Sequence, residues 1–220
     1  MADRSALRHS LAIGVSALEL EFELGAEALD RLLDYLALLE RWNATYNLTA
    51  IRDPAEMVVK HLLDSLAVLP HLDPRALADL GSGAGLPGIP IAIAEPARRV
   101  TLVESNGKKA RFLRECARAL ALANVDVVEA RAEHDARERL PGSAIARALA
   151  TLAALCRYAE PWVDADGHLH AMKGPGFEPE LAELPRGWVH DATRALSVPG
   201  LDAGRWLVVL KRSAGGRPAR

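Results

Sequence analysis

The chain of 220 residues has the length of one large domain, and 50% of its residues are hydrophobic, enough for a sizeable core. The formal net charge of −2 does not by itself indicate a nucleic-acid partner, and the two cysteines have the spacing of neither a metal site nor a disulfide framework. Since the N-terminus has no apolar run long enough for a signal peptide or a membrane span, we expect a cytoplasmic protein with no membrane partner.

Residues 1–75 have the pattern of a helical extension. In AEALDRLLDYLALLERW (26–42), leucines recur at intervals of three and four residues and share one helical face. Asp53 and Pro54 then form a helix start, with an N-cap acceptor followed by a proline at the first helical position. One helix is predicted from there up to a linker at 70–75.

From residue 76 onward, predicted strands alternate with predicted helices, which is typical of a parallel α/β sheet. The predicted strands are, in chain order, 76–80, 99–105, 125–130, 143–148, 167–174, 188–198 and 205–212. No helix-length segment separates the last two strands, so we expect an antiparallel hairpin at one edge of the sheet. The α/β domain spans residues 76–212, and we expect the basic tail 213–220 to be disordered.

The stretch DLGSGAGLPG (79–88) follows the first strand and is dense in glycine, which indicates a tight turn or a close approach to a ligand. In an open α/β sheet, ligands bind beyond the carboxyl ends of the strands. Residues 83–88 match the dinucleotide pattern G-x-G-x-x-G, with Glu104 about twenty residues further on. The loop also resembles the nucleoside-binding loop of seven-stranded S-adenosylmethionine (SAM) methyltransferases. A turn without a ligand is the third interpretation.

Three features favour SAM. Asp79 lies in an otherwise apolar strand, where a buried acid needs donors such as the amides of the loop. The terminal hairpin is similar to the extra antiparallel strand of methyltransferases, which a dinucleotide fold lacks. Glu133 follows the third strand, where methyltransferases contact the adenine. The expected fold is therefore a seven-stranded, Rossmann-like SAM-dependent methyltransferase sheet with an antiparallel C-terminal hairpin strand and an N-terminal helical extension.

Several segments carry a more specific resemblance, which covers roughly residues 30–212. They are RWNATYNLT (41–49), KHLLDSL (60–66), DLGSGAGLPGIPIAI (79–93), ESNGKKARFL (104–113), IARA around Arg147, MKG around Lys173 and GRWLVVLK (204–211). With these segments the chain resembles the bacterial 16S ribosomal RNA guanine-N7 methyltransferases, also called glucose-inhibited division protein B. ESNG stands where many members have DS-x-x, and this departure bears on the shape of the pocket. The resemblance implies SAM as cofactor, guanine N7 in 16S (small-subunit) rRNA as target, and the rRNA or the small ribosomal subunit as partner.

The resemblance also implies roles for individual residues. Glu104 should accept hydrogen bonds from the ribose hydroxyls of the cofactor. Arg147 and Lys173 end the fourth and fifth strands and are the expected catalytic residues, beside the methyl group. The implied cofactor-binding residues are Asp79, Gly81, Gly83, Gly85, Leu86, Glu104, Ser105, Ala132, Glu133 and Arg147. A purely structural or solvated role stays open for Glu104, Leu86 and Lys173.

Other polar residues are candidates for RNA contact or for bracing. The candidates for binding RNA phosphates are Arg131, Arg205, Lys211 and Arg212, with Arg217 and Arg220 of the tail. The residues Asn43, Tyr46, Asn47 and Thr49 either brace the N-terminal helices or touch RNA. His61 and Asp64 lie three residues apart on a predicted helix. Without a third ligand they are expected to form a structural pair, and no metal site is predicted.

The chemistry of the target agrees with what the sequence lacks. Guanine N7 has a free lone pair, so its methylation requires alignment of the reacting atoms and no general base. Cys116 and Cys156 fall in predicted helices, which argues against the covalent cysteine of cytosine C5 methylation. IARALATL (145–152) stands where amine-directed methyltransferases have N/D-P-P-Y/F.

Three alternatives to this function stay open. An NAD-dependent oxidoreductase would need a catalytic dyad, and none is well placed in the sequence. A non-catalytic RNA-binding protein would tolerate a damaged glycine loop, yet Asp79, Glu104 and Glu133 are present. A small-molecule or protein methyltransferase would share the loop. We expect the protein to be a monomer.

Overall fold

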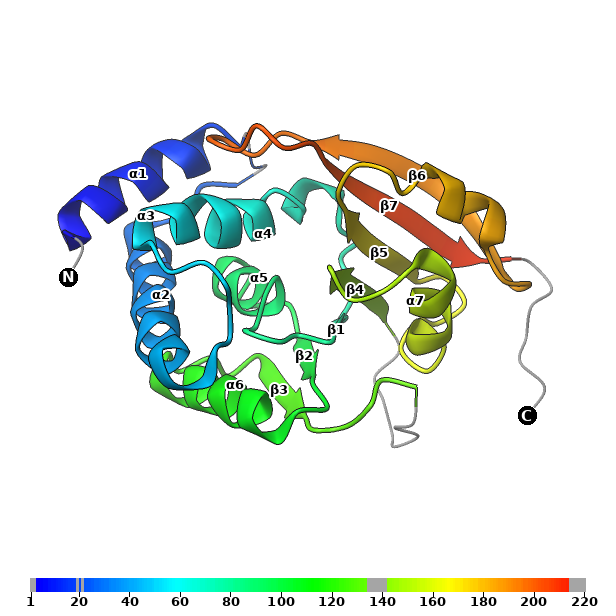
Figure 1. The fold of residues 1–220 in the computed structure, drawn as a ribbon, viewed down its shortest axis with the longest axis horizontal. Coiled ribbons are helices and arrows are strands. Elements are labelled where there is room, and N and C mark those ends of the chain that lie inside the picture. The colour runs from blue at the N-terminus through cyan, green and yellow to red at the C-terminus, as the bar shows by residue number, and fades with distance from the viewer. Residues whose placement is uncertain (1–2, 19, 21, 134–141, 214–220) are drawn as a thin grey trace.

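The computed structural model describes residues 3–18, 20, 22–133 and 142–213. The strands among these residues form one seven-stranded sheet in the order β3-β2-β1-β4-β5-β7-β6 (Figure 1). The strands are β1 (Leu77–Leu80), β2 (Val100–Val103), β3 (Val125–Val128), β4 (Ser143–Arg147), β5 (His168–Lys173), β6 (Trp188–Leu196) and β7 (Arg205–Arg212). The first five strands are parallel, and β7 runs antiparallel between β5 and β6. The predicted fold class and its terminal hairpin are confirmed.

Helices cover both faces of the sheet (Figure 1). The α-helices are α1 (Arg4–Ser16), α2 (Ala26–Tyr46), α3 (Pro54–Met57), α4 (Asp64–Leu66), α5 (Gly88–Ala94), α6 (Gly107–Ala119) and α7 (Leu152–Ala159), and two 3-10 helices are η2 (Leu69–His71) and η3 (Glu178–Glu183). One face packs against α5 and α6, over which α2 lies, and the other packs against α7. None of the described helices is long and apolar enough to cross a bilayer.

Alternation along the strands divides the core into two layers. In β1, Leu77 belongs to the cluster on the α5 side, whereas Ala78 and Leu80 belong to the cluster on the α7 side. This period of two is the geometry of a strand that is buried on both faces. Asp79 therefore points toward α5, which explains how an acid enters a buried strand next to the glycine loop.

The N-terminal helices share a core with the sheet. Leu32, Leu36 and Leu39 of α2 pack in one cluster with Ile91 of α5 and Phe112 of α6. The predicted leucine face of α2 is thus the face that covers the sheet layer. Because these helices rest on α5 and α6, they can reach the loops at the carboxyl ends of the strands.

Two details differ from the sequence predictions. The helix that begins at Asp53 is not regular: α3 passes into a π-helical turn, Val58–Leu63, before α4. Apolar periodicity does not reveal a single π turn, because it changes the repeat for only a few residues. The predicted loop at 175–185 contains the short helix η3. In the predicted tail, residues 214–220, with Arg217 and Arg220, lie outside the described residues.

Candidate active site

A cleft made of three adjoining pockets lies at the carboxyl ends of the parallel strands. The large pocket, about 510 Å³, is lined by Asp64, Arg147 and Lys173 among others. The β3-side pocket, about 240 Å³, lies over the ends of β2 and β3, and the glycine-loop pocket, about 150 Å³, lies over the loop after β1. Gly81 lines both smaller pockets, and Arg147 lines both the large pocket and the glycine-loop pocket. This is the edge where a ligand of an open α/β sheet is expected.

Asp79 fixes the glycine loop from below. Its side chain is fully buried, and its Oδ2 accepts a hydrogen bond of 2.9 Å from the amide of Gly88, the first residue of α5. A Cβ atom at Gly88 would come within 2.7 Å of that oxygen, so only glycine fits there. Burial raises the pKa of Asp79 to about 7, against the opposing effects of Gly88 and Arg147. The expected amide donor is therefore present, and Asp79 lies beneath the loop.

Glu104 holds the loop from the end of β2. Its Oε2 accepts the amide of Gly83 at 2.9 Å, and its Oε1 accepts the amide of Asn106 at 2.8 Å. An ionised carboxylate offers about four lone-pair sites, so further donors can still be accepted. Gly83 has a positive φ of 58°, and a Cβ there would meet only the carbonyl of Gly81, at 3.7 Å. The backbone of Gly83 is therefore open to a ligand.

The β3-side pocket brings together four of the predicted cofactor residues. Gly81, Ser105, Ala132 and Glu133 line it, with apolar walls from Val103, Leu149 and Tyr158. The carbonyl of Ala132 accepts a hydrogen bond of 3.1 Å from the indole of Trp162. This contact anchors the turn after β3 to the segment that follows α7.

The glycine-loop pocket is braced by the N-terminal helices. Gly81, Gly83 and Leu86 line it together with Thr49 and His61. Gly85, also a predicted cofactor residue, faces the core and not the pocket, because a Cβ atom on it would meet Ile89 and Leu113.

Tyr35 is a contributor that sequence reasoning missed. It is fully buried in α2, and its hydroxyl donates a hydrogen bond of 2.6 Å to the carbonyl of Ala84 in the loop. Burial raises the pKa of Tyr35 well above its ordinary value, which keeps this donor protonated. A tyrosine inside the apolar face of a helix was the available signal, since a buried hydroxyl needs a partner.

Asp64 joins the two arginines of the large pocket. Its side chain is 3% exposed, and its Oδ2 accepts from Arg147 Nη1 at 2.9 Å while its Oδ1 accepts from Arg205 Nε at 3.1 Å. Arg147 Nη1 also donates to the carbonyl of Lys60, at 3.1 Å. A carboxylate shared by two guanidinium groups fixes the side chain of Arg147 at the end of β4.

The expected pairing of His61 with Asp64 is wrong. His61 Nε2 lies 2.9 Å from Thr49 Oγ1, whereas Asp64 binds the two arginines. The π-helical turn makes the spacing between these two residues irregular, so a prediction from regular helix geometry fails. Burial and the nearby charge of Arg147 lower the pKa of His61 to about 4.

Lys173 is held against the wall of the large pocket. Its Nζ donates to Glu180 Oε2 at 2.8 Å and to the carbonyl of Ala150 at 3.2 Å. The same Glu180 oxygen accepts the amide of Leu152, the first residue of α7, at 2.6 Å. Glu180 lies in a segment predicted as a loop, and nothing in its sequence context indicated this role.

The RNA-contact candidates are not gathered at one place. Arg131 is exposed at the β3-side pocket, and Arg205 lies in the large pocket. Lys211 pairs with Asp191 at 2.5 Å, while Arg212 lies 4.5 Å from the ring centre of Trp188. In the sheet register, Lys211 pairs with His168, the first residue of β5, so it lies at the amino-terminal ends of the parallel strands, away from the cleft.

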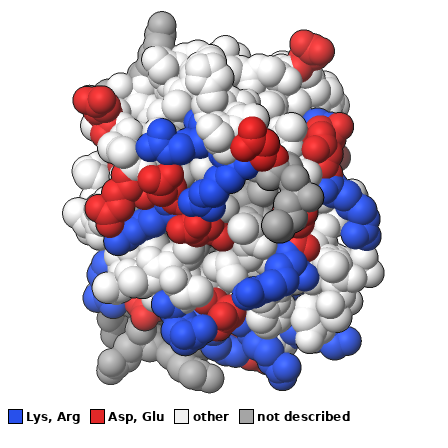
Figure 2. Space-filling model, turned by 90° about the vertical axis from the view of Figure 1, so that its left-hand side faces the viewer, with Lys and Arg blue, Asp and Glu red and all other residues white. Residues whose placement is uncertain are grey.

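The surface that carries α1, α2 and α6 has charges of both signs. Figure 2 shows blue and red side chains interspersed on this side of the molecule. Arg114 of α6 pairs with Glu129 at 2.8 Å, and Arg118 pairs with Glu115 at 2.9 Å. Such exposed pairs contribute little to stability and are typical of a solvated face.

Asn43 braces the turn that leads to the glycine-loop pocket. Its Oδ1 accepts the amide of Thr49 at 2.9 Å, and its side-chain amide donates to the carbonyl of Ile51 at 3.4 Å. Asn47, with a positive φ of 50°, ends α2 and accepts a hydrogen bond from Arg52. Bracing is thus the role that the geometry gives to Asn43.

The strand order with β7 inserted antiparallel between β5 and β6, the glycine loop after β1 and the acid at the end of β2 define a Rossmann-like methyltransferase fold. A family model described as rRNA small subunit methyltransferase G (GidB) matches residues 28–208. The chain belongs to this family, which confirms the resemblance inferred from the sequence segments.

Relatives of known name agree with this assignment. A protein of Xanthomonas axonopodis pv. citri (strain 306) named ribosomal RNA small subunit methyltransferase G is 53% identical over 208 residues, which are 92% of this chain and 98% of the relative. A protein of the same name from Stenotrophomonas maltophilia (strain K279a) is 53% identical over 207 residues, covering 92% and 97%. A solved mutant of MtNAS in complex with S-adenosylmethionine has a TM-score of 0.54 at 16% identity, covering 94% of this chain and 88% of that one, and shows a similar fold.

Proposed function

We propose that the protein is a cytoplasmic SAM-dependent methyltransferase that methylates guanine N7 in 16S rRNA and acts as a monomer. The observation that carries the proposal is the continuity of the cleft. The glycine loop, fixed by Glu104, adjoins a pocket of about 510 Å³ that is lined by Arg147 and Lys173. Family membership, and the printed names of the relatives, support small-subunit rRNA as the substrate.

The residues of the two smaller pockets, together with Glu104 at the end of β2, fit the cofactor. Glu104 can accept the ribose hydroxyls with its remaining lone pairs, and the open backbone of Gly83 allows close approach. Val103, Leu149 and Tyr158 offer apolar walls for the adenine. The proposed cofactor residues that line these pockets are Gly81, Gly83, Leu86, Ser105, Ala132, Glu133 and Arg147. Glu104 joins them from the end of β2, where it holds the amide of Gly83, while Asp79 and Gly85 are proposed to act through the shape of the loop.

Arg147 is proposed to bind the carboxylate of the cofactor. Its two hydrogen bonds, to Asp64 and to the carbonyl of Lys60, both use Nη1. Within the described part of the chain the other guanidinium nitrogens therefore remain as donors, and the side chain already lines the glycine-loop pocket. A planar guanidinium matches a carboxylate in geometry and in charge.

The large pocket is proposed to take the target base. When bound, SAM supplies a methyl group on a sulfonium. Guanine N7 attacks through its lone pair and loses no proton, so Arg147 and Lys173 need only position the reacting groups. Arg147, Arg205 and Lys173 are balanced in part by Asp64 and Glu180, so the pocket carries little excess charge against a base that becomes cationic.

The base must leave its stack to enter the cleft, so an exposed loop of folded rRNA is a better substrate than a duplex. Arg131 and Arg205 lie at the cleft and are proposed to bind RNA phosphates. Lys211 and Arg212 lie at the amino-terminal ends of the parallel strands, and would contact RNA only where it extends around the molecule.

Methyl transfer with labelled SAM tests the proposal. The protein is incubated with small ribosomal subunits, or with 16S rRNA, from cells that lack this activity, and label in the rRNA is counted. We expect label in the rRNA, and a Glu104→Gln variant that binds SAM at least tenfold more weakly. Glu129→Gln, at an exposed ion pair, is the matched control and should bind normally. Normal SAM binding without label on any form of rRNA would overturn the substrate and leave the cofactor standing.

A further inference from the structure

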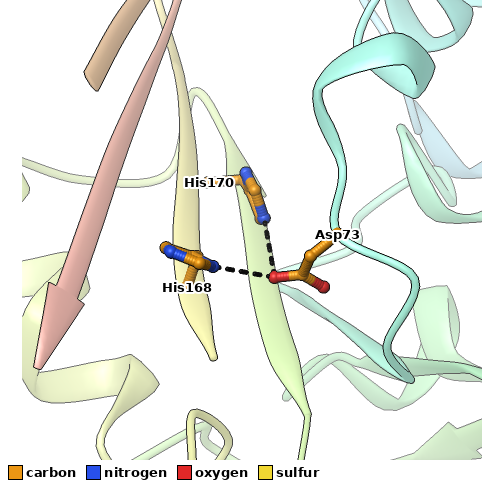
Figure 3. A group of neighbouring side chains, drawn as sticks. All are labelled: Asp73, His168 and His170. Atoms are coloured by element: carbon orange, nitrogen blue, oxygen red, sulfur yellow. Dashed lines mark hydrogen bonds and ion pairs between the residues drawn. The ribbon is translucent and has the colours of Figure 1, made fainter. Parts of the chain in front are cut away.

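A second group of polar side chains lies at the amino-terminal ends of the parallel strands, opposite the cleft at their carboxyl ends. Asp73 follows η2 in the linker to β1. His168 and His170 are two residues apart in β5, so their side chains lie on the same face of the sheet. Figure 3 shows both imidazole rings directed at one carboxylate oxygen of Asp73. The group joins a linker to a strand about 95 residues later, and the proposed methyl transfer makes no use of it.

The distances within this group are close to those of a metal site. His168 Nδ1 lies 2.9 Å from Asp73 Oδ2, and His170 Nε2 lies 3.7 Å from the same oxygen. One ligand atom from each residue lies within 4.8 Å of the others. Ligands at about 2.0 Å from a tetrahedral ion are about 3.3 Å apart, so small side-chain rotations suffice.

His170 gives an independent indication of a ligand. Its side chain is 2% exposed, and neither ring nitrogen has a hydrogen-bond partner among the described residues. The 3.7 Å from Nε2 to Asp73 Oδ2 is too long for a hydrogen bond. A buried polar atom left without a partner is costly, so such an atom in a native structure requires an explanation. A cation between Nε2 and Oδ2 would supply the missing partner.

Neighbouring groups orient the three side chains. Ser143 Oγ donates to Asp73 Oδ2 at 2.6 Å and accepts the amide of His168 at 2.9 Å. Asp191 Oδ2 lies 3.9 Å from His168 Nε2, the ring nitrogen that does not face Asp73. Carboxylates and hydroxyls that hold the far side of metal ligands are a regular feature of metal sites.

The charges around the group suit a cation with a neutral ligand. A neutral imidazole is the form that binds metal, and the carboxylate of Asp73 supplies the negative charge of the ligand set. Two cations near the group are already paired: Arg98, which donates to the backbone carbonyl of Asp73 at 2.7 Å, pairs with Glu95, and Lys211 pairs with Asp191.

We propose that Asp73, His168 and His170 bind one divalent transition-metal ion, with zinc as the best match, and that the ion joins the linker before β1 to β5. Two imidazole nitrogens and one carboxylate oxygen are a ligand set that zinc accepts, with water in the remaining position. Bound there, the ion stabilises the fold from the end of the strands opposite the cleft and leaves methyl transfer unchanged.

The test is titration of the full-length protein, without a histidine tag and stripped with chelator, with zinc chloride in a calorimeter. We expect one equivalent to bind with micromolar or tighter affinity and to raise the melting temperature. X-ray absorption of the zinc complex should show nitrogen and oxygen ligands without sulfur.

Three variants make the titration specific. His168→Ala, at a partly exposed position, and Asp73→Asn should each weaken zinc binding at least tenfold while keeping the circular dichroism of the folded chain. His9→Ala removes an exposed histidine on α1 and should bind zinc as the wild type does. Absence of saturable binding by the folded wild type, or wild-type affinity for zinc in both His168→Ala and Asp73→Asn, would overturn the site and identify a metal-free ion pair.

Discussion

Asp64 is the residue on which the geometry of the large pocket depends most. Changing Asp64 to Asn removes one charge from a buried carboxylate that two arginines share, and leaves both guanidinium groups underpaired. Removing one partner of a buried pair costs about 3–5 kcal/mol, but Arg147 and Arg205 are partly exposed, so we expect a loss of about 1–3 kcal/mol. Urea denaturation measures this loss, and methyl transfer should fall as Arg147 loses its fixed position.

A matched change separates this effect from the general cost of losing a carboxylate. Asp34 forms an exposed ion pair with Arg4 on the helical face, so Asp34→Asn should alter stability by no more than about 0.5 kcal/mol. Equal losses in the two variants would show that Asp64 is no more than a surface charge.

His61 predicts a dependence of stability on pH. Its pKa in the folded chain is lowered from 6.5 to about 4, first by burial and then by Arg147. Between these values the unfolded chain binds more protons, so the contribution of His61 is complete above about pH 6.5 and is lost as the pH falls toward 4. The difference in unfolding free energy between wild type and His61→Gln should shrink over this interval.

Nuclear magnetic resonance of the imidazole protons reports the same quantity directly. The resonance that disappears in His61→Gln identifies the residue, and its titration midpoint should lie near 4. A midpoint close to 6.5 would contradict the buried, neutral ring described here.

Residues could be predicted from sequence where a local pattern fixes them. Asp79 and Glu104 stand at defined places around a glycine loop, and the loop binds both through its own amides. The roles of Asp64 and Glu180 could not be predicted, because their partners come together only through the packing of the N-terminal helices and of η3. The partners of Asp64 lie 83 and 141 residues away, and those of Glu180 lie 7 and 28 residues away. An acid in a helix or loop carries no signal of this kind by itself.

At the scale of elements, α2 is predicted to hold the glycine loop in place. Tyr35→Phe leaves the carbonyl of Ala84 buried without its donor, which should cost about 1–2 kcal/mol. Because the loop borders the proposed cofactor pocket, the affinity for SAM should also fall severalfold, as measured by calorimetry. Tyr46→Phe, at an exposed position on the same helix, should change neither quantity. Unchanged SAM affinity in Tyr35→Phe would separate the helix from the function of the loop.

Most helices and strands could be predicted from the spacing of their apolar residues. The leucine spacing of α2 and the short apolar runs of the strands gave clear patterns, so the type and order of α2 and of the seven strands were predicted correctly, whereas η3 was predicted as a loop. The π-helical turn between α3 and α4 escaped prediction, because both α and π turns bury a similar set of apolar residues. His61 is buried in that turn. The missed turn is why the predicted pair of His61 with Asp64 differs from the observed partners, Thr49 for His61 and the two arginines for Asp64.

At the scale of the whole molecule, the carboxyl ends of the parallel strands should contact RNA more than their amino-terminal ends do. Arg131 is exposed at the cleft, whereas Arg212 lies at the opposite end of the strands and is bound to Glu160 and Trp188. Arg131→Ala should therefore weaken binding to 16S rRNA and reduce the slope of log affinity against log salt by about one ion contact. Arg212→Ala should have a smaller effect in the same filter-binding assay. Equal effects would place RNA at both ends of the strands.

The most direct test of the account is the identity of the methylated nucleoside. Small ribosomal subunits treated with the protein and labelled SAM are digested to nucleosides, which are separated and identified by mass spectrometry. We predict labelled 7-methylguanosine, strongly reduced with Arg147→Ala and present with Asp34→Asn. Label in any other nucleoside, or none despite measurable SAM binding, would contradict the claim that this cleft aligns guanine N7 with the methyl group.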